Sequence, residues 1–111
     1  MNRLEHPFVG AVADQAAHLR RGTRLVLGLL DSIEGGAVDV HVGTDLTRRV
    51  GRGPCVAHMS VADEAVFDEI LAKGDIGFAE AWMAGDWQTA DLPALLTLLA
   101  RNRETLQSAI H

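Results

Sequence analysis

The chain of 111 residues is long enough for one hydrophobic core and too short for two, so we expect a single domain over 1–111. Hydrophobic residues make up 48% of it and charged residues 23%, which are the values of a globular protein. The net charge of -5, with no basic stripe carrying interleaved aromatic residues, argues against nucleic acid as a partner.

Apolar residues at helical spacing mark two segments in the N-terminal third. Pro7, at a favourable first position, opens a predicted amphipathic helix over 7–19. Thr23 can cap a second predicted helix over 24–34, which has one leucine-rich face. The two glycines at 35–36 supply a stop after it.

The spacing of apolar residues then changes from helical to alternating. Over 37–42 valines alternate with Asp39 and His41, which predicts a half-buried strand. A second, more polar strand is predicted over 46–50, and a third, apolar strand over 55–61. Because the three strands follow one another so closely, we predict an antiparallel meander.

Three helices are predicted after the sheet. The first covers 64–73 behind a cap at Asp63, and the second covers 76–84 behind a cap at Asp75. The third begins at Asp91 and has basic residues in its last turn. The predicted fold class is therefore α+β: two N-terminal helices, a meander of about three strands, and three helices packed on the sheet.

Motifs for catalysis or metal binding are absent from the sequence. It has no glycine-rich phosphate loop, HExxH, CxxC pair or GxSxG, so no catalytic residue is predicted. The five histidines show no ligand spacing, and only His41 and His58 could approach each other, on strands of one sheet; we predict no metal site. The single cysteine, Cys55, is interpreted as a buried, small hydrophobic residue that is not part of a disulfide.

Aromatic and sulfur-containing side chains are the strongest candidates for ligand contact. Phe78 and Trp82 are four residues apart and share a helix face. Together with Met59, Met83 and Trp87 they are predicted to line an apolar pocket, and the alternative is that they fill the core.

Few charged residues are candidates for a functional role. Glu80 is the polar candidate, because it lies inside an apolar helix and is not needed as a cap. Arg48, Arg49 and Arg52 are candidates for contact with phosphate head groups, and the alternative is an ordinary solvated surface.

The segment Gly74–Trp87, GDIGFAEAWMAGDW, contains both tryptophans of the chain. With 91–96 (DLPALL) and 98–102 (LLARN), it resembles the N-terminal accessory domain of the cyclopropane-fatty-acyl-phospholipid synthase family. The resemblance covers about 23–102 and implies a sterol-carrier-like layout with a role in lipid engagement or dimer formation. The methyltransferase domain of that family is not matched here, and Trp82 stands where the family more often has tyrosine.

The resemblance and the missing catalytic motifs predict a non-catalytic lipid-binding accessory domain. It would present phospholipid or acyl chains to an S-adenosylmethionine-dependent methyltransferase on another chain or a further domain, and would hold no cofactor itself. We expect a cytoplasmic protein, because no signal peptide or membrane span of roughly 18 apolar residues is found, with peripheral contact at the inner face of the membrane. The alternatives are a dimerisation or protein–protein interaction module and an N-terminal fragment of a full synthase.

Overall fold

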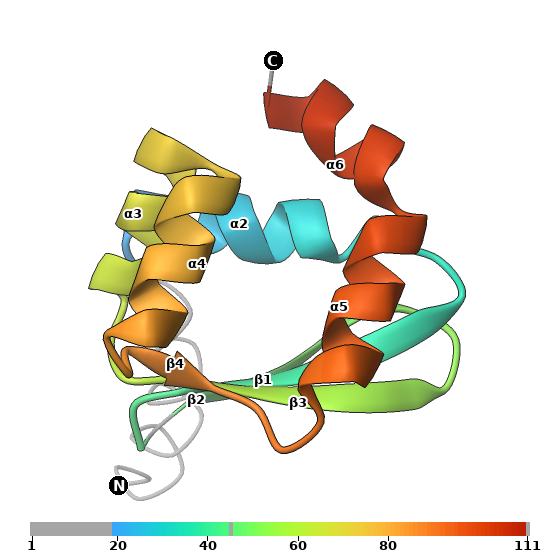
Figure 1. Cartoon of the computed structure of the whole chain (residues 1–111), viewed down its shortest axis with the longest axis horizontal. Coiled ribbons are helices and arrows are strands. Elements are labelled where there is room, and N and C mark those ends of the chain that lie inside the picture. Colours follow the sequence, from blue (N-terminus) through green and yellow to red (C-terminus); the bar gives the residue numbers. More distant parts are fainter. Residues whose placement is uncertain (1–18, 45, 111) are drawn as a thin grey trace, which may run out of the picture.

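The computed structural model describes residues 19–44 and 46–110, with only the backbone for 109 and 110. Within them, one helix precedes a four-stranded mixed sheet and four helices follow the third strand (Figure 1). In chain order the elements are α2 (Arg21–Leu30), β1 (Gly36–Val42), β2 (Leu46–Arg52), β3 (Cys55–Val61), α3 (Ala65–Lys73), α4 (Asp75–Met83), β4 (Trp87–Gln88), α5 (Leu92–Arg101) and α6 (Arg103–Ile110). The α+β class is confirmed, while the helix predicted over 7–19 lies outside the described residues except for its last position.

The strand order is β2-β1-β3-β4, so the predicted antiparallel meander was wrong. β1 pairs with β2 antiparallel, but β3 lies on the other side of β1 and runs parallel to it. Between β2 and β3 the chain crosses the start of β1, where a Cβ on Gly53 would come within 2.9 Å of the Gly36 nitrogen. Gly51 and Gly53 have φ values of 96° and 126°, so glycine is what permits this crossing.

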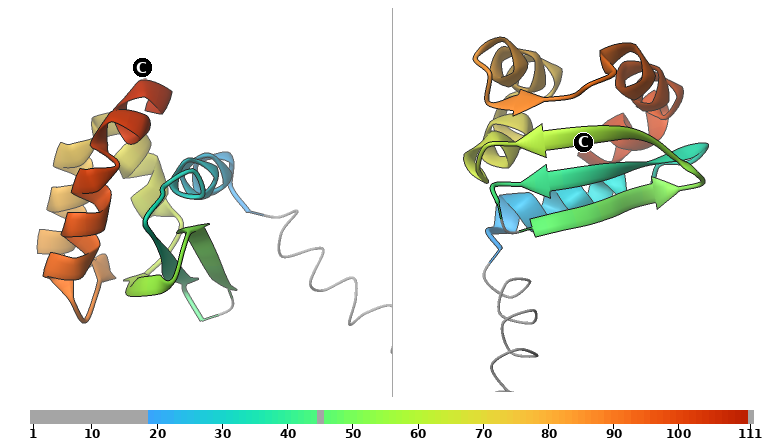
Figure 2. Two further views of the ribbon diagram at one scale, coloured as in Figure 1. Left: turned by 90° about the vertical axis from the view of Figure 1, so that its right-hand side faces the viewer. Right: turned by 90° about the horizontal axis from the view of Figure 1, so that it is seen from below.

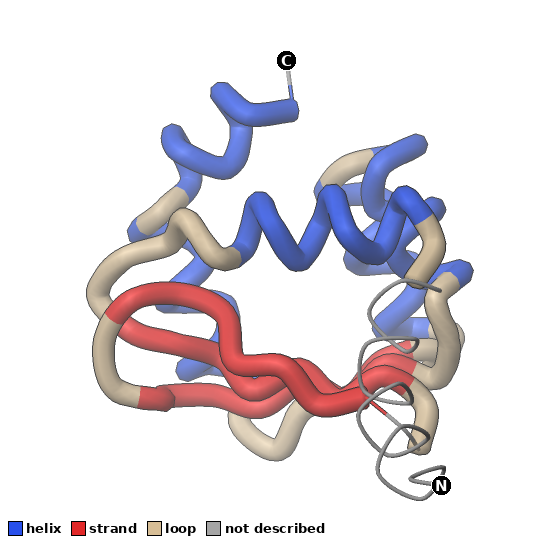
Figure 3. Tube along the Cα trace, turned by 180° about the vertical axis from the view of Figure 1, so that it is seen from behind, coloured by secondary structure: helices blue, strands red, loops and turns tan. Residues whose placement is uncertain are grey.

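All the described helices lie on one side of the sheet. Figures 1 and 3 show two layers, with the strands below and the helices above, and the view from below in Figure 2 looks onto the strands. Val38, Val40 and Val42 point into the space between the layers and are at most 7% exposed. The alternation of apolar residues in β1 thus correctly predicted which face is buried.

The start of α2 differs from the sequence prediction. Thr23 is fully buried inside the helix, and its hydroxyl donates to the Glu64 carboxylate at 2.6 Å. The same carboxylate oxygen accepts from the Arg20 backbone N–H, also at 2.6 Å. Thr23 is therefore not an N-cap; it joins α2 to the start of α3. The helix ends at Leu30, four residues earlier than predicted.

The boundaries of α3 and α4 are set mainly by local backbone chemistry. The Asp63 carboxylate accepts from the Ala65 N–H at 2.7 Å, and Gly74 ends α3 with φ 60°, as predicted. Asp75 is instead the first residue of α4 and makes no capping bond, so its predicted role was wrong. A Cβ on Gly77 would lie 2.4 Å from the Glu69 carbonyl oxygen, so a glycine is needed where α3 and α4 pack together.

A helix that was not predicted, α6, follows the last predicted one, so four helices follow β3 instead of three. The Asp91 carboxylate caps α5 by accepting from the Ala94 N–H at 3.1 Å, as predicted. At the break, the buried Asn102 side chain accepts from the Glu34 N–H at 2.8 Å and donates to the carbonyls of Glu34 and Leu98, both at 2.9 Å. The two bonds to Glu34 fix the junction between α5 and α6 against the chain just before β1, and the bond to Leu98 closes the last turn of α5. None of the described helices is long and apolar enough to cross a membrane.

Candidate functional site

A cavity of about 510 Å³ lies between the sheet and the helices. Its wall consists largely of aliphatic and aromatic side chains contributed by β1, β3 and all five described helices. The lining residues are Val26, Leu29, Leu30, Val38, Met59, Phe67, Ile70, Gly74, Asp75, Phe78, Leu95, Leu96, Leu99, Ala100, Arg103, Leu106 and Gln107. The space is of the size and apolar character that proteins use for small hydrophobic ligands, about 300–1,000 Å³.

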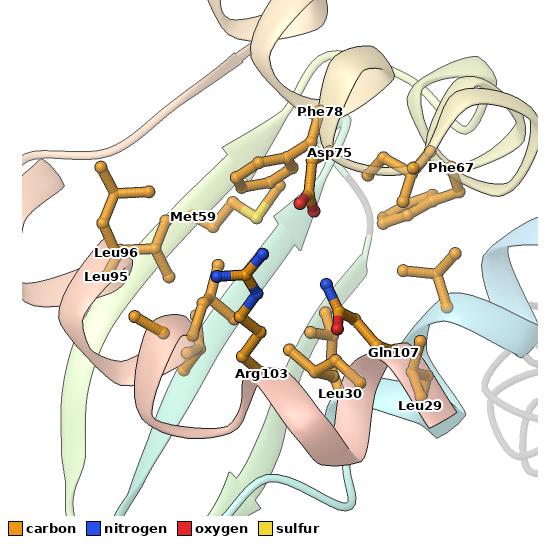
Figure 4. Close-up of a pocket in the computed structure, with 17 residues that line it drawn as sticks. Leu29, Leu30, Met59, Phe67, Asp75, Phe78, Leu95, Leu96, Arg103 and Gln107 are labelled. Carbon is orange, nitrogen blue, oxygen red and sulfur yellow. The ribbon is translucent and has the colours of Figure 1, made fainter. Parts of the chain in front are cut away.

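Three polar side chains converge at one side of this cavity. Arg103 and Gln107 are four residues apart on α6 and extend from the same helix face toward Asp75, the first residue of α4 (Figure 4). All three residues are exposed to solvent, whereas the lining residues Met59 and Phe67 are buried. The cavity therefore has a largely apolar interior and polar side chains at one side, here called its mouth.

Phe78 is held at the cavity wall by Trp87. The two rings stack with centroids 4.4 Å apart and an interplanar angle of 21°. The Trp87 indole N–H donates to the Phe78 carbonyl at 2.8 Å, and Trp87 is only 2% exposed. Trp87 thus lies behind the wall and fixes the orientation of the phenyl ring that faces the cavity.

The predicted pocket residues separate into two groups. Met59 and Phe78 line the cavity, and Trp87 packs directly behind Phe78. Trp82 and Met83 do not line it; they are 43% and 72% exposed on the outer side of α4. Trp82 touches the site only indirectly, with its ring centroid 6.5 Å from that of Trp87.

The contribution of α6 was not predicted from the sequence. Arg103 was interpreted only as a basic residue at the end of the helix that begins at Asp91, and Gln107 was given no role. Both become mouth residues because the chain turns at Asn102 and α6 folds over the cavity. A buried Asn inside a leucine-rich helical pattern is the one signal that marks this turn in the sequence.

The charged candidates lie away from the cavity. Glu80 is exposed and pairs with Lys73 at 3.4 Å. Arg48, Arg49 and Arg52 are exposed on β2, and none of them is among the lining residues.

The sheet face turned away from the helices carries a second cluster, centred on Asp39. Arg49 donates to both Asp39 carboxylate oxygens, at 2.7 and 3.1 Å. This hydrogen bonding lowers the pKa of Asp39 to about 2, so the group is ionised at neutral pH. His58 lies 3.8 Å from the same carboxylate, and its ring stacks on His41 with centroids 6.1 Å apart. Cys55 is half-buried beside them, not fully buried as interpreted from the sequence.

Comparison with protein-family models, with curated proteins and with solved structures found no match for this chain.

Proposed function

We propose that the protein is a non-catalytic lipid-binding domain whose cavity accepts one acyl chain. The observation that carries this proposal is an apolar cavity of about 510 Å³ with a polar mouth formed by Asp75, Arg103 and Gln107. Burying a hydrocarbon chain against these leucines and Phe78 contributes roughly 0.8 kcal/mol for each methylene removed from water. A ligand with a long apolar tail is therefore favoured over a polar metabolite.

The mouth supports a specific orientation of the ligand. Arg103 carries a permanent positive charge on a planar fork of donors that matches a carboxylate or a phosphate. Gln107, one turn further along α6, offers an additional amide donor. The acidic head of the lipid would lie at these two side chains, with its tail between α5 and β3.

The proposal includes presentation of the chain to an S-adenosylmethionine-dependent methyltransferase, on another chain or a further domain. The segment Gly74–Trp87, which resembles the synthase accessory domain, supplies both Phe78 and the indole that holds it. The resembling stretch thus coincides with one wall of the cavity, which supports a sterol-carrier-like mode of lipid engagement. The domain would act in the cytoplasm, in peripheral contact with the inner face of the membrane.

Titration of the protein with an environment-sensitive fluorescent fatty acid tests acyl-chain binding. We expect saturable, stoichiometric binding that unlabelled palmitic acid displaces. Ala100 is exposed yet lines the cavity, so Ala100→Trp should fill the space without disturbing the core and should abolish binding. Ala72 is exposed on α3 and does not line the cavity, so Ala72→Trp is the matched control and should bind normally. Absence of saturable binding to the unmodified protein would overturn the proposal.

A second pair of variants tests the role assigned to the mouth. Loss of a hydrogen bond to a charged group costs about 1.5–3 kcal/mol, so Arg103→Gln should weaken fatty-acid binding roughly 10-fold or more. Arg101 is also exposed, on the last turn of α5, but does not line the cavity, and Arg101→Gln should leave affinity unchanged. Equal effects of the two substitutions would contradict head-group recognition by Arg103.

Homodimerisation is a second candidate function, favoured by the outer side of α4. Ile76 and Met83 share one face of α4 and are 66% and 72% exposed, while Trp82, on the neighbouring face, is 43% exposed. If this surface joins two copies, light scattering over a dilution series should give a dimer that Met83→Glu converts to a monomer. A monomeric unmodified protein at every concentration would exclude this function.

A further inference from the structure

The open face of the sheet brings together three side chains that commonly bind metal ions. The parallel pairing of β1 and β3 places Asp39 opposite His58 and Ala37 opposite Cys55. A register shift between Ala37 and Val38 leaves Val56, between Cys55 and Ala57, without a partner on β1. In this arrangement, one ligand atom from each of Asp39, Cys55 and His58 lies within 4.8 Å of the other two. A meander would have separated these strands, so the cluster depends on the observed topology.

These distances are close to those of an assembled zinc site. With Zn–N and Zn–O bonds of about 2.0–2.2 Å and a Zn–S bond of about 2.3 Å, ligand atoms of a tetrahedral centre lie about 3.3–3.6 Å apart. The Nδ1 atom of His58 is already 3.8 Å from the Asp39 carboxylate. The His58 side chain is 62% exposed and can rotate toward the carboxylate. The remaining distances, up to 4.8 Å, also require the Cys55 thiol to leave the Ala57 carbonyl, to which it donates at 3.4 Å.

The surroundings of Asp39 suit a metal-binding carboxylate. Arg49 donates to both carboxylate oxygens of Asp39, at 2.7 and 3.1 Å, and so holds the carboxylate in one orientation. Each carboxylate oxygen has two lone pairs, so the oxygen nearest His58 can bind a cation while Arg49 retains its bonds. Hydrogen bonds of this kind orient metal-binding carboxylates in many proteins.

We propose that Asp39, Cys55 and His58 bind a zinc ion, with the fourth coordination position open to water or another small ligand. A thiolate and an imidazole select zinc and related transition metals over Mg²⁺ and Ca²⁺, which prefer oxygen ligands. Binding deprotonates the Cys55 thiol, forms the S–Zn bond and releases the proton to solvent. The site lies on the opposite side of the sheet from the lipid cavity, so this inference stands independently of the proposed function.

His41 lies beside this site but is not one of its three ligands. Its ring stacks on that of His58 at an interplanar angle of 13°, and its Nδ1 is 3.0 Å from the Thr47 hydroxyl. Phenylalanine can maintain the stack at position 41 but offers no nitrogen to a metal ion.

Cobalt titration of the chelator-treated full chain tests the site directly. Co²⁺ bound to a thiolate gives a near-ultraviolet charge-transfer band, and we expect this band to saturate at one equivalent and to disappear when Zn²⁺ is added. Cys55→Ser should abolish the band. His58→Phe should lower cobalt affinity at least 10-fold, because about this much affinity is lost even when a residue that only hydrogen-bonds to a metal ligand is removed. His41→Phe is the matched control and should retain the band and most of the affinity.

Circular dichroism of each variant separates loss of the site from loss of the fold. His6, His18 and His111 are unchanged in every variant, so a loss specific to His58→Phe cannot come from them. The inference is overturned if folded unmodified protein gives no charge-transfer band. It is also overturned if His41→Phe and His58→Phe lower cobalt affinity equally, because the assigned ligands would then be wrong.

Discussion

The two faces of the sheet differ in what they bury and in the chemistry they offer. On the helix-covered face, valines of β1 meet leucines and aromatic rings around a cavity with an apolar wall. On the open face, alternate residues of the same strand bring Asp39 and His41 together with Arg49 and His58. β1 thus contributes both to the wall of the apolar cavity and to the polar cluster. The two lie on opposite faces of the sheet because successive side chains of a strand point to opposite sides.

This contrast predicts that the two faces respond to different perturbations. Interactions on the covered side depend on packing, so they should be sensitive to the volume of side chains and insensitive to pH. Interactions on the open side depend on ionised groups near solvent, so they should be sensitive to pH and little affected by small changes in volume.

The largest effect is expected for Trp87→Ala on the covered side. Trp87 is 2% exposed, stacks on Phe78 and donates to its carbonyl, so its removal leaves a large cavity and removes this hydrogen bond. The free energy of unfolding should fall by about 3–5 kcal/mol. Urea denaturation measures this, and a loss below about 1 kcal/mol would show that the indole is not part of the core.

An intermediate effect is expected for Asn102→Ala at the junction of α5 and α6. The substitution removes three hydrogen bonds and leaves both backbone groups of Glu34 without this partner. We expect a loss of about 1–3 kcal/mol and weaker fatty-acid binding, because α6 carries the mouth residues. Normal lipid affinity in this variant would contradict the dependence of the mouth on the Asn102 junction.

A small effect is expected for Trp82→Ala. Trp82→Ala removes the same type of side chain as Trp87→Ala, but the Trp82 indole is 43% exposed and does not line the cavity. The free energy of unfolding should change by less than about 1 kcal/mol and fatty-acid affinity should be unchanged. A large decrease in affinity would place Trp82 in ligand contact and would revive the pocket role predicted from sequence.

The smallest effect is expected on the open face, as a dependence on acid. The folded-state pKa of Asp39 lies below its ordinary value of 3.8, at about 2, so its ionised form stabilises the fold at higher pH. That contribution is lost as the pH falls from about 4 toward 2. With EDTA present, the unmodified protein should lose stability over this range more steeply than Asp39→Asn, and identical pH profiles would show that the Asp39–Arg49 pair does not contribute.

Local patterns predicted most of the elements but not how they pair. The valine alternation, the Asp91 cap and the Gly74 stop depend on neighbouring residues, and all three were predicted correctly. The parallel β1–β3 pairing depends on glycines 51 and 53 crossing the start of β1, which no periodicity encodes. Closely spaced strands are more simply connected as a meander, and that preference produced the error.

The candidate site was predictable only where it depends on one helix face or strand. Met59 and Phe78 were identified because large apolar residues concentrate near them. Arg103 and Gln107 reach the cavity only because Asn102 bonds to Glu34, a residue 68 positions earlier in the sequence. Contacts over such a separation leave no periodic signal.

Quenching of Trp87 fluorescence by a brominated fatty acid tests acyl-chain binding in the cavity most directly. In Trp82→Phe the only indole is Trp87, stacked 4.4 Å from the phenyl ring that lines the cavity. Bromine quenches only at short range, so we predict saturable quenching in this variant and much weaker quenching in Trp87→Phe, where the exposed Trp82 remains. Saturable binding with no quenching of Trp87, or equal quenching of both indoles, would contradict an acyl chain seated against Phe78.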